Sequence, residues 1–267
     1  MDDQSSSMDA YAPKVIAGKI EAMGVSKANA DSLTVFVLAL LAGAFISLAA
    51  LLFTVVITDS QLGFGVTRLL GGLSFCLGLV LVIVAGAELF TGNNLLAMAW
   101  ASKRISSRAV LRNWLLSYLG NVLGCLGTVA LVLLADIGSQ ANGGVGATAL
   151  QIASAKGELS LLETFSRGIL CNALVCMAVW LAMAGHSVTD KILAVIFPVT
   201  AFVALGFEHS IANWFFLPFA MLLDPQSSIS LGSAAGNLLA ATAGNIVGGT
   251  LLVAGVYWLA YLRKGHG

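Results

Sequence analysis

The chain has 267 residues, of which 58% are hydrophobic and 10% are charged, and its mean hydropathy is +0.94. Soluble domains carry about 25% charged residues, so this chain has too little polar surface to be one. Its formal net charge is zero, which argues against a nucleic-acid partner. Several long apolar stretches instead predict a polytopic helical protein embedded in a lipid bilayer.

Six apolar stretches follow one another along the chain. They lie at residues 33–58, 69–101, 113–135, 161–184, 191–223 and 232–262. The second and the fifth have 33 residues each, which is roughly 50 Å of continuous helix against about 30 Å of hydrocarbon. Polar residues interrupt both, at 88–94 and at 208–213. We therefore expect helices 2 and 5 to be broken, with irregular segments that line a polar cavity.

The two interruptions match each other in spacing. Three residues recur 120 positions later, namely Gly86, Glu88 and Asn93 as Gly206, Glu208 and Asn213. A second motif, Gly-Asn-x-x-Gly, occurs at 120–124 and again at 244–248. Residues 33–135 and 161–262 therefore appear as two copies of one three-helix unit, inverted because each has an odd number of crossings. The predicted fold is an all-α membrane protein with six transmembrane helices in an inverted 3+3 repeat, which places a substrate path between the copies.

The distribution of basic residues predicts the orientation. An even number of crossings puts both termini on one side of the membrane. That side would hold ten of the thirteen Lys and Arg residues, and the other side only Arg68, Lys156 and Arg167. The positive-inside rule then places both termini in the cytoplasm.

The chain outside the six helices is short. Residues 1–32 are predicted to form a cytoplasmic amphipathic segment, 33–262 the six-helix domain, and 263–267 a cytoplasmic tail. A helix within the first segment is expected to lie on the membrane surface. Its apolar and polar faces would be formed by Val15, Ile16, Ile20 and Met23 on one side and by Lys14, Lys19 and Glu21 on the other.

The polar residues in the two interruptions are the candidate site residues. Glu88, Asn93, Glu208 and Asn213 are expected to stabilise the broken loops by binding backbone amides, with proton relay as the alternative role for the carboxylates. His209 is a functional candidate because an ionisable group at membrane depth is costly and histidine exchanges protons near neutral pH. The sequence shows no cluster of metal-ligating residues, so we expect no metal, no cofactor and no enzyme activity.

Three segments resemble signature motifs of the formate/nitrite transporter family. They are AGAELFTGN at 85–93, GILCNALVC at 168–176 and FEHSIAN at 207–213. The first and third resemble the loops that break helices 2 and 5 in this family, and the second resembles its fourth-helix motif. The resemblance extends over residues 15–262, and the third motif is more similar to the formate branch than to the nitrite branch.

The resemblance implies an aquaporin-like channel domain and a homopentamer with one pore per subunit. The cargo would be formate or a similar small anion, and the location a bacterial inner membrane. Leu89, Phe90 and Thr91 would form the cytoplasmic constriction, and Phe75, Leu79 and Phe202 a second one. His209 would lie between the constrictions, beside Thr91, as a proton-exchanging group. Lys156 would attract anions, and Asn172 would make a polar contact.

Several alternatives remain open at this point. In one alternative, the protein is a channel of the same family that conducts nitrite or hydrosulfide. In another, it is a proton-coupled transporter of short monocarboxylates. Lys156 lies in a connection with Gly and Ser residues, where it is either a solvated loop charge or an attractor of anions. Asn172 either binds a neighbouring helix or contacts the substrate.

The predicted topology is tested by reporters fused to the chain ends. A reporter that is active only in the cytoplasm is expected to function when it follows Gly267, because ten of the thirteen basic residues map to that side. A fusion at the same position that functions only in the periplasm would contradict the orientation.

Overall fold

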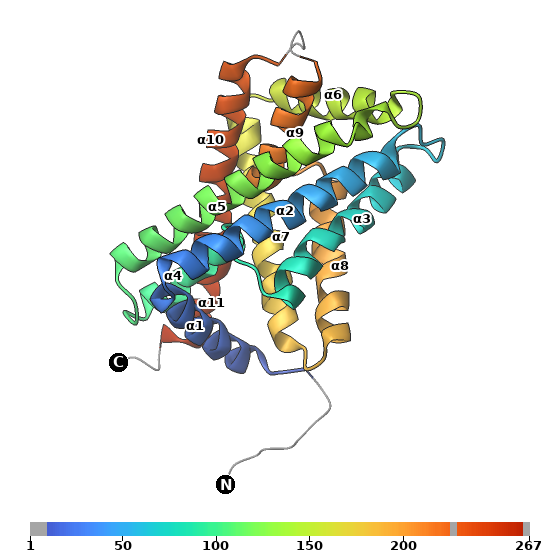
Figure 1. Cartoon of the computed structure of the whole chain (residues 1–267). Helices are drawn as coiled ribbons and strands as arrows, with labels where there is room; N and C mark the ends of the chain where they lie inside the picture. Colours follow the sequence, from blue (N-terminus) through green and yellow to red (C-terminus); the bar gives the residue numbers. More distant parts are fainter. Residues whose placement is uncertain (1–9, 225–228, 264–267) are drawn as a thin grey trace.

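The computed structural model describes residues 10–224 and 229–263, which form helices and connecting loops without any β-strand (Figure 1). The all-α prediction is therefore confirmed for the described residues. Residues 1–9 of the predicted N-terminal segment and residues 264–267 of the predicted tail lie outside them.

The main helices follow the predicted apolar stretches in order. They are α2 (Ser32–Ile57), α3 (Phe64–Ala85), η1 (Gly92–Leu95), α4 (Leu96–Ala101), α5 (Ser107–Leu134), α7 (Leu161–Ala184), α8 (Val188–Ala204), α9 (Ser210–Leu223), α10 (Leu231–Val247), η3 (Gly248–Gly255) and α11 (Val256–Tyr261). Within the described ranges, five helical segments are long and apolar enough to cross a membrane: α2, α3, α5, α7 and the continuous segment Leu231–Tyr261. The fifth predicted crossing is divided between α8 and the shorter apolar helix α9, so the count of six crossings stays a prediction.

Both long stretches are interrupted near the expected positions. Helix α3 ends at Ala85, and Gly86 then takes the left-handed conformation with φ of 82°, as a glycine after a helix commonly does. Helix α8 ends at Ala204, and Gly206 has φ of 70°. Helical structure resumes at η1 and at α9. Asn213 consequently lies in the first turn of α9 and not in the irregular segment before it.

One helix was not predicted from the sequence. Helix α6 (Gly144–Gly157) occupies the connection before α7, which we expected to be a loop because of its Gly and Ser residues. It packs against α9 at the end of the molecule opposite α1 (Figure 1). Its four alanines favour helix, and burial of Val145, Ala149 and Ala153 on one face stabilises it. Lys156 lies in its last turn, so the interpretation of Lys156 as a loop residue is wrong.

The N-terminal helix α1 (Pro13–Asn29) packs against α4, α7 and α11 (Figure 1). Ile16 and Ile20 are buried as expected, whereas Val15 is 48% exposed. Glu21 is only 6% exposed, and its Oε2 accepts a hydrogen bond from Arg104 Nη1 at 3.0 Å. The expectation that Glu21 lies on a solvated face is therefore wrong, because an ion pair allows this carboxylate to be buried.

Glycines bring two pairs of helices into close contact. A Cβ atom at Gly124 of α5 would collide with the Leu40 carbonyl of α2, and one at Gly248 would collide with the Ile169 carbonyl of α7. Gly120 and Gly244 occupy the equivalent places one turn earlier. Small residues permit such close approach between membrane helices. The Gly-Asn-x-x-Gly motif that occurs twice in the sequence thus makes the same helix contact twice.

Gly124→Ala is expected to destabilise the protein by about 1–3 kcal/mol, because the added methyl group overpacks the contact between α2 and α5. Gly127→Ala is the matched control, since a Cβ there has no atom within 4 Å. Thermal unfolding in detergent should show a lower Tm for the first variant and an unchanged or higher Tm for the second. Equal Tm values would contradict the packing argument.

Candidate functional site

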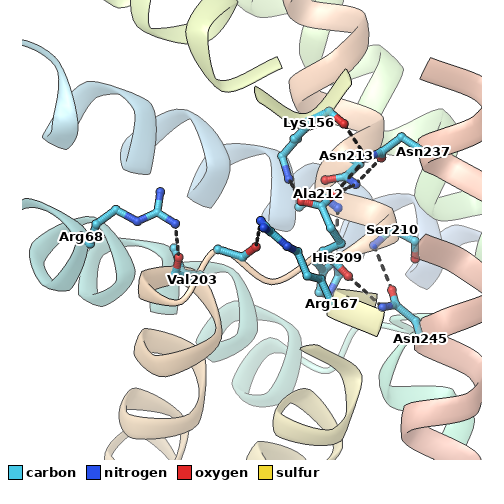
Figure 2. Close-up of polar contacts among 12 residues, drawn as sticks. Arg68, Lys156, Arg167, Val203, His209, Ser210, Ala212, Asn213, Asn237 and Asn245 are labelled. Carbon is cyan, nitrogen blue, oxygen red and sulfur yellow. Dashed lines mark hydrogen bonds and ion pairs between the residues drawn. The ribbon is translucent and has the colours of Figure 1, made fainter. Parts of the chain in front are cut away.

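A buried carboxylate lies at the break between α8 and α9. Glu208 is 2% exposed, and its Oε1 lies 2.8 Å from Lys156 Nζ. Its Oε2 accepts hydrogen bonds from Asn213 Nδ2 at 2.7 Å and from Asn237 Nδ2 at 3.2 Å (Figure 2). Asn237 Nδ2 also donates to the Lys156 carbonyl at 3.2 Å. The carboxylate is therefore fully engaged by one lysine and two asparagines.

The same network occurs at the break after α3. Glu88 Oε1 lies 2.9 Å from Lys27 Nζ, and Asn93 Nδ2 donates to Glu88 Oε2 at 2.7 Å. Asn113 holds the place that Asn237 holds in the second copy, since its Oδ1 accepts from Asn93 and its Nδ2 donates to the Lys27 carbonyl. The repeat that the sequence shows for Gly, Glu and Asn thus extends to a lysine and a second asparagine.

A further asparagine in each copy binds the irregular backbone. Asn121 Nδ2 donates to the Ala39 and Glu88 carbonyls at 2.7 and 2.9 Å, and its Oδ1 accepts from Phe90 N at 2.9 Å. Asn245 makes the equivalent three bonds, to the carbonyls of Gly168 and Glu208 and from Ser210 N. Backbone groups without a partner are very costly inside a membrane. These asparagines satisfy the groups that the helix breaks set free.

His209 lies at the start of α9 and is 3% exposed. Its Nδ1 accepts a hydrogen bond from Ala212 N at 3.1 Å, which caps the helix (Figure 2). Its Nε2 lies 3.2 Å from Thr91 Oγ1, so the two loops meet at this pair. Because Nδ1 acts as an acceptor, the ring is neutral and carries its proton on Nε2. Protonating Nδ1 would break this cap, and the proton-exchanging role expected from the sequence stays a prediction.

One cavity lies at each of the two helix breaks, and His209 lines the first of them. The first, here called the Lys156 vestibule, has a volume of about 150 Å³ and is lined in part by Lys156, Phe75, Phe202 and His209. The second, called the Lys27 vestibule, has a volume of about 240 Å³ and is lined in part by Lys27, Leu79, Leu89 and Lys191. Phe75 and Leu79 lie one turn apart on α3. Residues one turn apart on the same face of α3 therefore line different cavities.

The apolar residues implied by the resemblance fall into three places. Phe75 and Phe202 pack edge to face with ring centroids 5.9 Å apart in the Lys156 vestibule. Leu79 lines the Lys27 vestibule with Leu89 and belongs to the same buried cluster as the two phenylalanines, so its grouping with them stays a prediction. Phe90 packs on Tyr118 at 5.0 Å and lines neither vestibule.

Asn172 and Lys156 have defined protein partners. Asn172 is fully buried, and its Nδ2 donates to the Thr91 carbonyl, to Asn94 Oδ1 and to the Asn245 carbonyl. It thereby holds the loop that carries Thr91. The Lys156 side chain is 14% exposed and paired with Glu208. Its role in attracting anions stays a prediction.

The sequence interpretation missed five residues of the site. They are Lys27, Asn113, Asn237, Arg68 and Arg167, of which the two arginines line the Lys156 vestibule. Asn113 and Asn237 have the same 124-residue separation as Asn121 and Asn245. This spacing was the signal that would have found the asparagine pair.

A helical membrane fold with two vestibules separated by buried apolar side chains is that of a channel or transporter. The family model for "Formate/nitrite transporter" matches residues 14–259, and the chain belongs to this family. It is 40% identical to "Formate channel FocA" of Escherichia coli strain K12, with 96% of each chain covered. It is 36% identical to "Formate channel FocA" of Haemophilus influenzae, with 99% of each covered.

The fold is also similar to that of a solved structure described as "Pentameric formate channel with formate bound". The TM-score is 0.80 at 38% sequence identity, and the match covers 87% of this chain and 98% of the other. The family resemblance noted in the three sequence motifs is therefore confirmed over the whole chain.

Lys156→Met is expected to lower stability by about 3 kcal/mol, because it leaves the Glu208 carboxylate buried without a cation. The double variant Lys156→Met/Glu208→Gln should recover most of the loss, since a glutamine oxygen can still accept from the two asparagines. Lys27→Met should cost less, because the side chains of Lys27 and Glu88 are 21% and 12% exposed. Unfolding in detergent measures all three, and equal Tm values for the single and double Lys156 variants would refute the pairing argument.

Proposed function

We propose that this protein is a channel for formate and related small monovalent anions in a bacterial inner membrane. Each subunit of a homopentamer would contain one pore, and both termini would face the cytoplasm. The FocA relatives and the similarity to a solved pentameric formate channel support this proposal. Further support comes from large apolar side chains such as Leu115, Leu131 and Leu239 on the outer faces of the spans, where lipid or neighbouring subunits would cover them.

The contact between His209 and Thr91 is the observation that carries the proposal. In the proposed pore this polar pair would lie inside the membrane, with Phe75 and Phe202 on one side and Leu89 on the other. A narrow apolar passage opposes a bare ion, because desolvating a charge costs far more than desolvating a neutral molecule. A hydrogen-bond donor at the narrow point lowers that cost for a carboxylate.

His209 would act in this pore as a neutral donor. Its Nε2–H would donate to Thr91 Oγ1 and turn to a carboxylate oxygen of a bound substrate. Hydrogen bonds to a charged partner contribute roughly 1.5–3 kcal/mol. Formic acid crosses the apolar walls at a lower cost than formate. Flux should therefore rise as the pH falls, even though the histidine itself does not exchange the proton.

The four engaged polar residues of the breaks would have a structural role in this pore. Glu88, Glu208, Asn93 and Asn213 bind one another and the two lysines, so they stabilise the loops without contacting the anion. Asn172 would act similarly by fixing the Thr91 loop.

The proposed cargo is tested by flux into proteoliposomes at pH 7 and pH 5. Formate, acetate, lactate, nitrite and hydrosulfide are compared at equal concentration. The proposal expects formate to be conducted and its entry to be faster at pH 5. Faster conduction of nitrite or hydrosulfide than of formate would assign the chain to another substrate. Net accumulation of formate against its own gradient, driven by a proton gradient, would indicate a coupled transporter.

The variants His209→Asn and His209→Phe test whether His209 acts as a hydrogen-bond donor or as a proton-exchanging group. Asparagine keeps an oxygen that can cap α9 and an amide that can donate to the substrate, so formate flux should stay within a few-fold of wild type with the same pH profile. Phenylalanine has neither group, and flux should fall about tenfold or more. Liposome flux at several pH values, with assembly checked by size, measures both. A flattened pH profile in His209→Asn would show that His209 exchanges protons after all.

A further inference from the structure

The Lys156 vestibule is lined by two arginines, and neither makes an ion pair with an acidic side chain of the described residues. Arg68 of α3 and Arg167 of α7 both line this cavity. The ion pairs among the described residues join Lys27 to Glu88, Arg104 to Glu21, and Lys156 to Glu208. Glu163, one turn before Arg167, binds the amide and hydroxyl of Ser160 through its Oε2 as the N-terminal cap of α7. Glu163 is close enough to Arg167 for an electrostatic interaction but makes no ion pair with it, so both guanidinium groups in this vestibule lack a direct carboxylate contact.

Both guanidinium groups are held by the end of α8. Arg68 donates from Nε to the Ala204 carbonyl at 3.1 Å and from Nη2 to the Val203 carbonyl at 3.0 Å. Arg167 Nη1 reaches the Gly206 carbonyl at 3.4 Å (Figure 2). A Cβ atom at Gly206 would lie 2.9 Å from Arg68 Nη2 and 3.9 Å from Arg167 Nη1, so the two groups flank the same point of the chain. The glycine leaves room for both.

This arrangement fixes the two cations without neutralising them. Carbonyl groups at a helix C-terminus attract positive charge but carry no net charge themselves. Each guanidinium has five N–H donors, and the bonds above use two of Arg68 and one of Arg167. The remaining donors of two fixed, half-buried side chains are available to a ligand in the cavity. Planar guanidinium donors match the paired oxygens of a carboxylate or another oxyanion.

The two arginines, unlike the other charged and polar residues of the site, have no charged counterpart in the first copy of the repeat. Arg167 accepts the Glu208 amide through its carbonyl, and the equivalent residue in the first copy is Leu38, which accepts the Glu88 amide. Arg68 lies 120 residues before Val188, the spacing that relates α3 to α8. The lysine, glutamate and asparagines recur in both copies, whereas the arginines have apolar counterparts. They are thus not needed to build a helix break, and their charge serves this vestibule alone.

We propose that Arg68 and Arg167 form an oxyanion-binding site in the Lys156 vestibule. The site holds a small carboxylate next to Phe75, Phe202 and His209 before it enters the apolar passage. A divalent oxyanion such as sulfate binds the same donors more strongly, but it cannot shed its charge to cross the passage, so it blocks the pore. The role in transport rests on the proposed formate conduction, whereas the binding itself does not.

Sulfate is the probe for a binding experiment on the full chain in detergent. The variant Arg68→Gln/Arg167→Gln keeps amide donors for the α8 carbonyls but removes both charges. Arg108→Gln is the control, because it removes an exposed arginine of α5 far from the cavity. Thermal unfolding is followed as sulfate replaces chloride at constant ionic strength. Wild type and Arg108→Gln should show a saturable rise in Tm, and the double variant should show none. An equal rise in all three proteins would overturn the site.

Flux into proteoliposomes then tests the role in transport. With sulfate on both sides of the membrane, formate entry should be inhibited in wild type and not in the double variant. Without sulfate, the double variant should need about tenfold more formate for half-maximal flux and keep its maximal flux. A wild type that binds sulfate but conducts no formate would refute the proposed function and keep the site. A wild type that conducts formate with no inhibition by sulfate would refute the site's role in transport.

Discussion

The fold depends on one interaction that is made twice: a buried glutamate that receives a lysine and asparagines where a membrane helix is interrupted. Glu88 and Glu208 each lie directly after the glycine-containing turn that ends a helix. Breaking a helix at membrane depth exposes backbone groups that no water can satisfy. The nearby asparagines, Asn121 and Asn245, bind those groups, and the carboxylates orient the residues around them. Without these networks, a continuous helix would be the favoured structure.

Because both loops are fixed in this way, they can present their functional side chains to each other. Thr91 from the first break and His209 from the second meet at 3.2 Å, although they are 118 residues apart in the sequence. Asn172 secures the backbone of Thr91, and the α9 cap secures the ring of His209. The same cap determines the chemistry of the histidine, since an Nδ1 that accepts a hydrogen bond leaves Nε2 as the donor. The hydrogen bond from Ala212 N to His209 Nδ1 therefore both caps α9 and leaves Nε2 as the donor that the proposed function needs.

The repeat makes the two vestibules similar, and the residues that do not follow the repeat give the two vestibules different charges. Lys27 and Lys156 occupy matched places and are both neutralised by a glutamate, so neither distinguishes one vestibule from the other. Arg68 and Arg167 line only the Lys156 vestibule, and neither makes an ion pair with an acid in the described part of the chain. In the proposed channel, a substrate that enters from that side would contact these cations before the apolar side chains.

The class of fold, the helix breaks and part of the site could be predicted from the sequence. Apolar length and the spacing of Gly, Glu and Asn depend on residues that are near in the chain, and such patterns can be read directly. Only the structure shows that Lys156 belongs to helix α6 and pairs with Glu208. Only the structure shows that Arg68 binds the end of α8, more than 130 residues away in the sequence. These contacts join segments far apart in the chain, and no local pattern specifies them. Whether a charge is free or paired depends on which distant side chain lies beside it, so the tertiary structure alone distinguished the neutralised lysine from the available arginines.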